Sequence, residues 1–141
     1  NNGVELEFQG NAAGGSGYNE TVTCTHFTTR NHENDSATSL GYDTGSDLAQ
    51  STSFIPLTSG STANNNDDNC CSILHLFDPS NTTFVKHFIV RTQNINSTSD
   101  PNSNESYVAG YFNTTTALTR IRYKMSSGNI DSGTFKLYGV V

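Results

Sequence analysis

Two neighbouring segments near the end of the chain alternate strictly between apolar and polar side chains, and this pattern restricts the fold more than any other feature. In residues 117–125, Tyr123 shares one face with every second residue, while basic side chains fill the other face. In residues 134–140, Phe135 belongs to a similar apolar set. Because successive side chains of a strand point to opposite faces, each run reads as a half-buried strand. The glycine-containing residues 126–133 between them predict an antiparallel hairpin.

The rest of the chain repeats this rhythm in shorter runs separated by polar stretches. Asn, Ser and Thr are abundant, and charged residues make up only 14% of the chain. Asn and Ser compete with the helical backbone for hydrogen bonds, and Thr favours extended chain. We therefore expect a single all-β domain over residues 1–141, an antiparallel β-sandwich of the jelly-roll type with about eight strands. The expected strands are 4–8, 19–30, 51–57, 70–77, 83–91, 107–112 and the two strands of the hairpin, and the expected long loops are 31–46, 58–69 and 93–104.

The apolar faces of these strands predict the core. Each predicted core residue lies on an apolar face or in the most apolar strand, and Phe135→Ala is expected to destabilise the fold by about 3–5 kcal/mol. The predicted core residues are Val22, Phe54, Leu74, Leu76, Phe88, Val90, Ile121, Tyr123, Phe135 and Leu137.

Charge and composition argue against several classes of partner. The net charge of −6 disfavours binding to nucleic acid. No apolar run approaches the length that crosses a bilayer, and no signal peptide is apparent, so we expect no membrane partner. The three cysteines, Cys24, Cys70 and Cys71, are interpreted as free thiols, with a disulfide from Cys24 to one of the adjacent pair as the alternative.

Residues suited to metal binding or catalysis do not form a recognisable motif. His75 and His87 fall in neighbouring expected strands, but we interpret them as ordinary face histidines rather than a metal pair. The sequence Asp67-Asp68 lacks the order of a dedicated calcium loop. Glu5 and Glu7 do not resemble the opposed carboxylates of a glycosidase, and no nucleophile elbow is present. We expect no metal, no cofactor and no enzymatic activity, so a secreted carbohydrate enzyme is the least favoured function.

A series of short motifs runs through residues 110–140. It comprises an aromatic glycine-rich strand at 110–112, a T-x-I-x-Y strand at 119–123, GNI-x-SG at 128–133 and T-F-x-LYG-V at 134–140. This series resembles the carboxy-terminal part of a group of bacteriophage virion proteins, and residues 41–43 and 86–88 also match that group. The resemblance implies a β-sandwich and a structural place in a virion, and it implies no catalytic residue because the group shares none.

The resemblance leads us to expect a non-enzymatic phage structural protein, either a capsid decoration (cement) protein or a short surface appendage. Its expected location is the virion surface after synthesis in the host cytoplasm. Its expected partners are capsid or tail proteins of the same virion, and we expect a homotrimer. The candidate contact is a basic stripe on the outward face of the hairpin, formed by Arg120, Arg122, Lys124 and Lys136.

The alternative function is a receptor- or glycan-binding module of a tail fibre. Such a module needs exposed aromatic rings on which a sugar or a receptor can stack. Trp, the most useful residue for this purpose, is absent from the chain. The candidate platform is Tyr42, Tyr107 and Tyr111.

Overall fold

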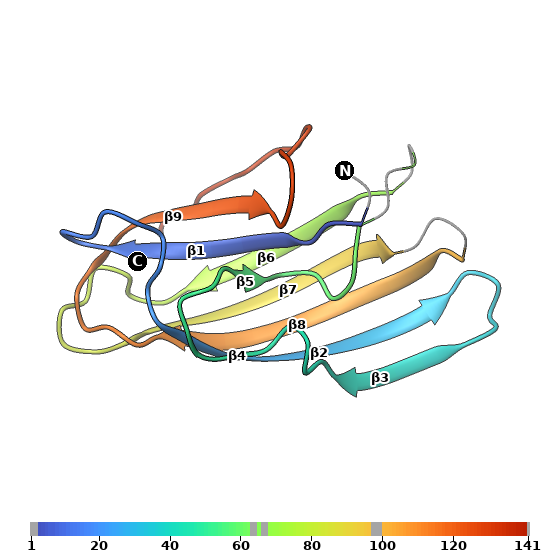
Figure 1. Cartoon of the computed structure of the whole chain (residues 1–141), viewed down its shortest axis with the longest axis horizontal. Helices are drawn as coiled ribbons and strands as arrows, with labels where there is room; N and C mark the ends of the chain where they lie inside the picture. The colour runs from blue at the N-terminus through green and yellow to red at the C-terminus, as the bar shows by residue number, and fades with distance from the viewer. Residues whose placement is uncertain (1–2, 63–64, 66–67, 97–99, 141) are drawn as a thin grey trace.

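The computed structural model describes residues 3–62, 65, 68–96 and 100–140, and over these residues the protein is an all-β sandwich of antiparallel strands. Two sheets face each other, as Figure 1 shows, with β1 and β9 above the longer strands of the second sheet. The expected fold class is therefore confirmed. The jelly-roll order of connections stays a prediction.

The small sheet has the order β5-β1-β9, and the large sheet has the order β3-β2-β8-β7-β6, with β4 also pairing with β2. In Figure 1 the long strands β2, β7 and β8 form the centre of the large sheet. The strands of the small sheet are β5 (Ile55–Pro56), β1 (Leu6–Ala12) and β9 (Leu118–Met125). Those of the large sheet are β2 (Val22–His32), β3 (Thr38–Tyr42), β4 (Leu48–Ser51), β6 (Cys70–Leu76), β7 (Lys86–Asn96) and β8 (Asn102–Phe112).

Three of the expected boundaries are wrong. The stretch 93–104 is not one long loop, because β7 continues to Asn96 and β8 starts at Asn102. The expected loop 31–46 contains β3, and the expected strand 51–57 is divided between β4 and β5. Polar side chains point into the sandwich at the end of β7 and the start of β8, so the apolar signal that marks a strand is missing there. Every residue of β3 is exposed, so β3 has no buried face to mark it.

Several of these inward polar side chains are linked by hydrogen bonds, which lowers the cost of burying them. The backbone N–H of Ser59 donates to Ser106 Oγ at 2.9 Å, and the amide of Asn104 donates to the carbonyl oxygen of Ser59 at 2.6 Å. On the neighbouring strands, the hydroxyls of Ser72 and Thr92 lie 2.8 Å apart. The segment after β5 is thereby attached to the large sheet, and it closes this end of the sandwich.

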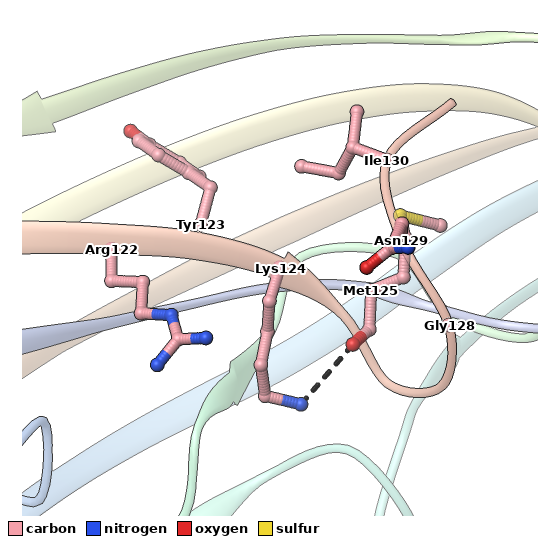
Figure 2. Close-up of a pocket in the computed structure, with 7 residues that line it drawn as sticks. All are labelled: Arg122, Tyr123, Lys124, Met125, Gly128, Asn129 and Ile130. Atoms are coloured by element: carbon pink, nitrogen blue, oxygen red, sulfur yellow. Dashed lines mark hydrogen bonds between the residues drawn. The ribbon is translucent and has the colours of Figure 1, made fainter. Parts of the chain in front are cut away.

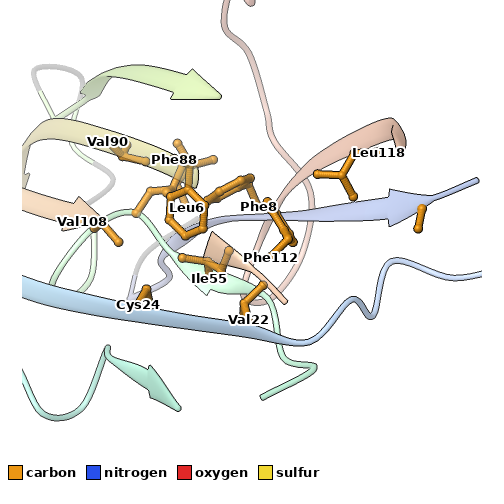
Figure 3. Packing of buried hydrophobic residues seen from close by; sticks show 12 residues of the cluster. Leu6, Phe8, Val22, Cys24, Ile55, Phe88, Val90, Val108, Phe112 and Leu118 are labelled. Carbon is orange, nitrogen blue, oxygen red and sulfur yellow. The ribbon is translucent and has the colours of Figure 1, made fainter. Parts of the chain in front are cut away.

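The hydrophobic core centres on Phe8 of β1, which joins the two sheets (Figure 3). Its ring stands edge-on to Phe88 at a centroid distance of 5.2 Å and edge-on to Phe112 at 6.0 Å. Of the predicted core, Val22, Phe88 and Val90 are buried, which confirms them. Leu74, Leu76 and Tyr123 are partly buried against the cluster, and Phe54 and Ile121 are partly buried. The prediction missed Leu6, Ile55, Leu57, Val108, Phe112 and Leu118.

The second strand of the predicted hairpin does not form. Residues 134–140 have no strand pairing, and the side chains of Phe135 and Leu137 are 58% and 89% exposed. Both residues are therefore wrong as core predictions, and the expected cost of Phe135→Ala is wrong with them. The partner of β9 is β1 instead, with Tyr123 opposite Phe8, and the inner face of β9 is only partly buried after Leu118.

Candidate interaction surface

The outer face of the large sheet carries a row of large side chains that crosses five strands. Strand register places the residues of this row directly opposite one another, so their side chains emerge on the same face. Most of the row is apolar or aromatic, although this side of the sheet faces solvent. The row consists of Tyr42 on β3, Phe27 on β2, Tyr107 on β8, Arg91 on β7 and Ile73 on β6.

Phe27 and Tyr107 form the centre of the row. Their rings are stacked at a centroid distance of 4.8 Å and an angle of 6°, and Arg91 lies 5.6 Å from the Tyr107 centroid. Phe27 comes from the strand on one side of β8 and Arg91 from the strand on the other side. Both faces of the Tyr107 ring are therefore already occupied within the protein.

An ion pair fixes the polar side of this row. Arg91 Nε donates to Glu105, and the Tyr107 hydroxyl donates to the same carboxylate at 2.7 Å. The hydrogen bond from Arg91, followed by the one from Tyr107, holds the pKa of Glu105 below its usual value. The bond to Glu105 also raises the pKa of Tyr107. These hydrogen bonds hold Arg91 and Tyr107 on the same carboxylate, and Arg91 and Glu105 are both ionised at neutral pH.

A shallow groove runs beside the aromatic row. It has a volume of about 280 Å³ and lies among Phe27, Tyr107 and the next row of side chains. In that row Thr25, Ala109 and Ile89 face one another across β2, β8 and β7. The side chains of Thr25 and Ala109 are too small to fill the groove, and the side chain of Ile89 beside them is 54% exposed. The groove therefore suits an apolar side chain from a partner.

Exposed large apolar side chains fall into two groups among the described residues. One group lies on and around the large sheet, and the other lies at and after Ile130. Contiguous exposed apolar surface commonly marks an interaction site. The first group contains Phe27, Leu40, Tyr42, Ile73, Phe77 and Ile89, with Phe84 in the adjoining loop, and the second contains Ile130, Phe135, Leu137, Tyr138 and Val140.

The structure brings the three tyrosines of the predicted platform to one face but does not make them a continuous platform. Tyr42 and Tyr107 belong to the same row, separated by Phe27. Tyr111 lies further along β8, where it contacts His87 at a centroid distance of 6.0 Å. The Tyr42 hydroxyl donates to Asp47 at 2.8 Å, and this bond raises its pKa.

The predicted basic stripe is only partly assembled. Arg120, Arg122 and Lys124 share the outer face of β9, but Lys136 lies outside both sheets because its strand does not form. The three remaining cations already have partners around β1. Arg120 donates to Asn11 Oδ1 at 2.8 Å, and Lys124 Nζ lies 2.5 Å from the Glu7 carboxylate.

The third cation of the stripe contacts the loop that follows β1. The Arg122 guanidinium lies 5.8 Å from the Tyr18 ring centroid. Arg120 also donates to the carbonyl oxygen of Gly15 at 3.0 Å. The stripe thus attaches this loop to the small sheet, and its charges are engaged within the protein.

Sequence reasoning missed Phe27, Arg91, Glu105 and Ile89 as surface residues of this face. The signal was present in β7, where His87, Ile89 and Arg91 alternate with buried residues. The apolar content of both faces led to the interpretation of residues 83–91 as the most apolar strand and a central one, and the outer face of this strand was not considered as a surface. β7 is central, but only its inner face is covered.

Cysteines and candidate metal ligands stay separate. Cys24 is buried, Cys70 half-buried and Cys71 exposed, and all three are free thiols. His75 and His87 lie on the outer face, but they do not stand opposite each other in the strand register. His75 is opposite Ile89, and His87 is opposite Tyr111. Among the described residues, no group of three or more His, Cys, Asp or Glu side chains could hold a metal ion. Asp67 lies outside the described residues.

Comparison with known proteins identifies no relative: no family model, curated protein or solved structure matches this chain. Within the described part of the chain, no helix is long and apolar enough to cross a membrane.

Proposed function

We propose that this protein is a structural component of a bacteriophage virion that attaches to a neighbouring virion protein through the outer face of its large sheet. The observation that carries the attachment surface is the exposed row from Tyr42 to Ile73, with the groove beside it. The resemblance of residues 110–140 to phage virion proteins supports the virion assignment. The role is a capsid decoration protein or a short surface appendage, without enzymatic activity.

The chemistry of the row favours a protein partner. Stacked aromatic rings beside an arginine are typical of the residues that dominate protein–protein interfaces. A partner side chain that enters the groove would contact Ile89 and Ala109 and would remove the apolar surface from water. Arg91 and Glu105 would form a polar rim that fixes orientation.

The remaining elements of the proposal concern the assembly. The partners are capsid or tail proteins of the same virion, and the protein forms a homotrimer at the virion surface after synthesis in the host cytoplasm. A sheet that exposes apolar residues on one face promotes aggregation of the free chain. Attachment to a particle covers this face and prevents such aggregation.

Binding to particles that lack the protein tests this surface. The double variant Phe27→Asp/Ile89→Asp changes two exposed side chains of the face, so the fold should be retained. We expect its affinity for particles to fall by more than about tenfold, which corresponds to a loss of about 1.4 kcal/mol. The matched control, Arg122→Glu, changes the other sheet and should bind within about twofold of the native protein.

The outcomes separate the two candidate surfaces. Loss of binding in the sheet-face variant alone supports the proposal, provided that far-UV circular dichroism shows the native β spectrum. Loss of binding only in Arg122→Glu would overturn it and would assign the contact to the basic stripe. Equal binding by all three proteins would exclude both surfaces.

A second candidate function is receptor or glycan binding by a tail-fibre module. The observation that favours it is the placement of Tyr42, Tyr107 and Tyr111 on one exposed face. Stacking on Tyr107 is disfavoured because both faces of its ring are occupied, so Tyr42 and Tyr111 would have to bind the ligand. Screening on a glycan array tests this function: binding abolished by Tyr42→Ala and Tyr111→Ala would support it, and absence of any bound glycan would reject it.

A further inference from the structure

The outer edge of β9 borders an open cleft. The cleft has a volume of about 550 Å³ and lies between residues 122–125 of β9 and residues 128–130 of the turn that follows. Figure 2 shows Tyr123 and Ile130 extending to one side of β9, with Arg122 and Lys124 on the other side. β9 pairs with β1 on one edge only, and no described strand pairs with its other edge. An unpaired edge of this kind is a template for an added strand.

The interior of the sandwich is incompletely filled next to this edge. Tyr123 and Met125 of β9 pack against the core cluster but are only partly buried. Leu74 and Leu76 lie on β6, the edge strand of the large sheet, and they too pack against the core cluster but are only partly buried. A strand added to β9 would bring apolar side chains against these residues and would extend the core.

The segment 134–140, called the arm below, has the properties of that strand. Phe135 and Leu137 lie on one face of its alternating pattern, as a strand beside Tyr123 requires. No residue of the arm makes a hydrogen bond within the described part of the chain, so its backbone is free to form a ladder. In Figure 1 the chain turns after β9 and runs back past it. The ring centroids of Phe135 and Tyr123 lie 5.1 Å apart, but the two segments do not pair as strands.

We propose that the arm of one copy pairs antiparallel with the outer edge of β9 in a second copy. Within its own copy the arm contacts Tyr123 through the Phe135 ring but forms no ladder with β9, so the arm and this edge of β9 are both left unpaired among the described residues. An arm from a neighbouring copy can pair with this edge along its length. Exchange among identical copies gives each copy one donated and one accepted strand. This exchange involves the small sheet and is independent of the virion surface proposed above.

Molar mass in solution tests the exchange. The variant Phe135→Asp/Leu137→Asp places charges on the exposed apolar face of the arm, and its matched control, Phe84→Asp, changes a 69% exposed side chain outside the arm. By light scattering after size exclusion, we expect the native protein and the control to be oligomeric and the arm variant to be monomeric with an unchanged β spectrum. A native protein that is monomeric at all concentrations, or an arm variant that assembles normally, would overturn the proposal.

Cross-linking distinguishes exchange between copies from pairing within one chain. Cys24 is replaced by Ala, and Cys70 and Cys71 by Ser, to remove the free thiols. One preparation then carries Tyr123→Cys, and a second, with a different tag, carries Phe135→Cys. After mixing and mild oxidation, we expect a disulfide between the two tagged chains, and none when Leu40→Cys on the other sheet replaces Tyr123→Cys. Absence of the mixed species contradicts exchange, as does a chain carrying both cysteines that closes only on itself.

Discussion

The ring of Phe27 lies almost parallel to the ring of Tyr107, with centroids 4.8 Å apart, on the outer face of the large sheet. The Tyr107 hydroxyl and Arg91 both donate to Glu105, so the stack is joined to an ion pair. We predict that Arg91→Gln raises the pKa of Glu105, because it removes the larger of the two stabilising hydrogen bonds. Tyr107→Phe should raise this pKa by a smaller amount. An NMR titration of the Glu105 carboxyl carbon measures both, and an unchanged pKa in Arg91→Gln would contradict the ion pair.

The core should depend on Phe8 and not on Phe135. Phe8 is fully buried between the sheets, so Phe8→Ala is expected to cost about 3–5 kcal/mol of unfolding free energy. Phe135→Ala removes an exposed ring and should cost less than about 1 kcal/mol. Urea denaturation of the two variants at a concentration where the protein is monomeric gives both values. A larger loss for Phe135→Ala than for Phe8→Ala would mean that the arm is part of the core.

Gly110 should not tolerate a side chain. A Cβ at this position would lie 2.4 Å from the carbonyl oxygen of Thr23 and 2.7 Å from both Cys24 Cβ and the Phe88 ring. Since backbone of the adjacent strand must move, Gly110→Ala should cost at least about 1–3 kcal/mol, the usual range for overpacking. Gly41→Ala is the control, because a Cβ at residue 41 would have no other atom within 4 Å. Equal thermal midpoints for the two variants would contradict the packing around Phe88.

Acid should weaken the fold through His26. Burial lowers the pKa of this histidine below 6.5, although the carboxylates of Asp43 and Asp47 and the backbone of Ser46 act in the opposite sense. The unfolded chain therefore binds a proton at a higher pH than the native state. Stability is retained above pH 6.5 and falls as the pH drops below that value, by no more than about 1.4 kcal/mol per pH unit for this one group.

The His26→Leu variant isolates this contribution. Its unfolding free energy should fall less than that of the native protein when the pH is lowered from about 7.5 to about 5.5, because it lacks the titrating group. Urea denaturation at the two pH values measures the difference. Identical losses in the two proteins would show that His26 titrates alike in the folded and unfolded states.

Alternation predicted the strands whose inner face is apolar and failed where the inner face is polar. Phe88 and Val90 mark β7 clearly, but the rest of β7 and the start of β8 carry the buried polar residues Asn94 and Asn104, which are joined by a hydrogen bond and do not resemble a core. Polar residues at such positions resemble a loop until the segment that covers them, here Ser59, is known. Long-range contacts of this kind have no local signal in a sequence.

The arm and the candidate surface illustrate two further limits. Residues 134–140 have the pattern of a strand, but pattern does not specify which edge a strand joins, and within one copy it joins none. Phe27 and Arg91 could each be seen to lie on strands, yet their meeting at Tyr107 depends on the register of β2, β8 and β7. Register follows from tertiary packing, so the alignment of the row could not be derived from periodicity alone.

A cryo-EM reconstruction of the virion at side-chain resolution tests the proposed function most directly. We predict copies of this protein on the particle surface, with Phe27 and Ile89 buried against a neighbouring virion protein and Arg91 at the rim of that contact. A particle in which the outer face of the large sheet points to solvent would contradict the attachment surface. A purified particle that contains no copy of the protein would contradict the virion assignment itself.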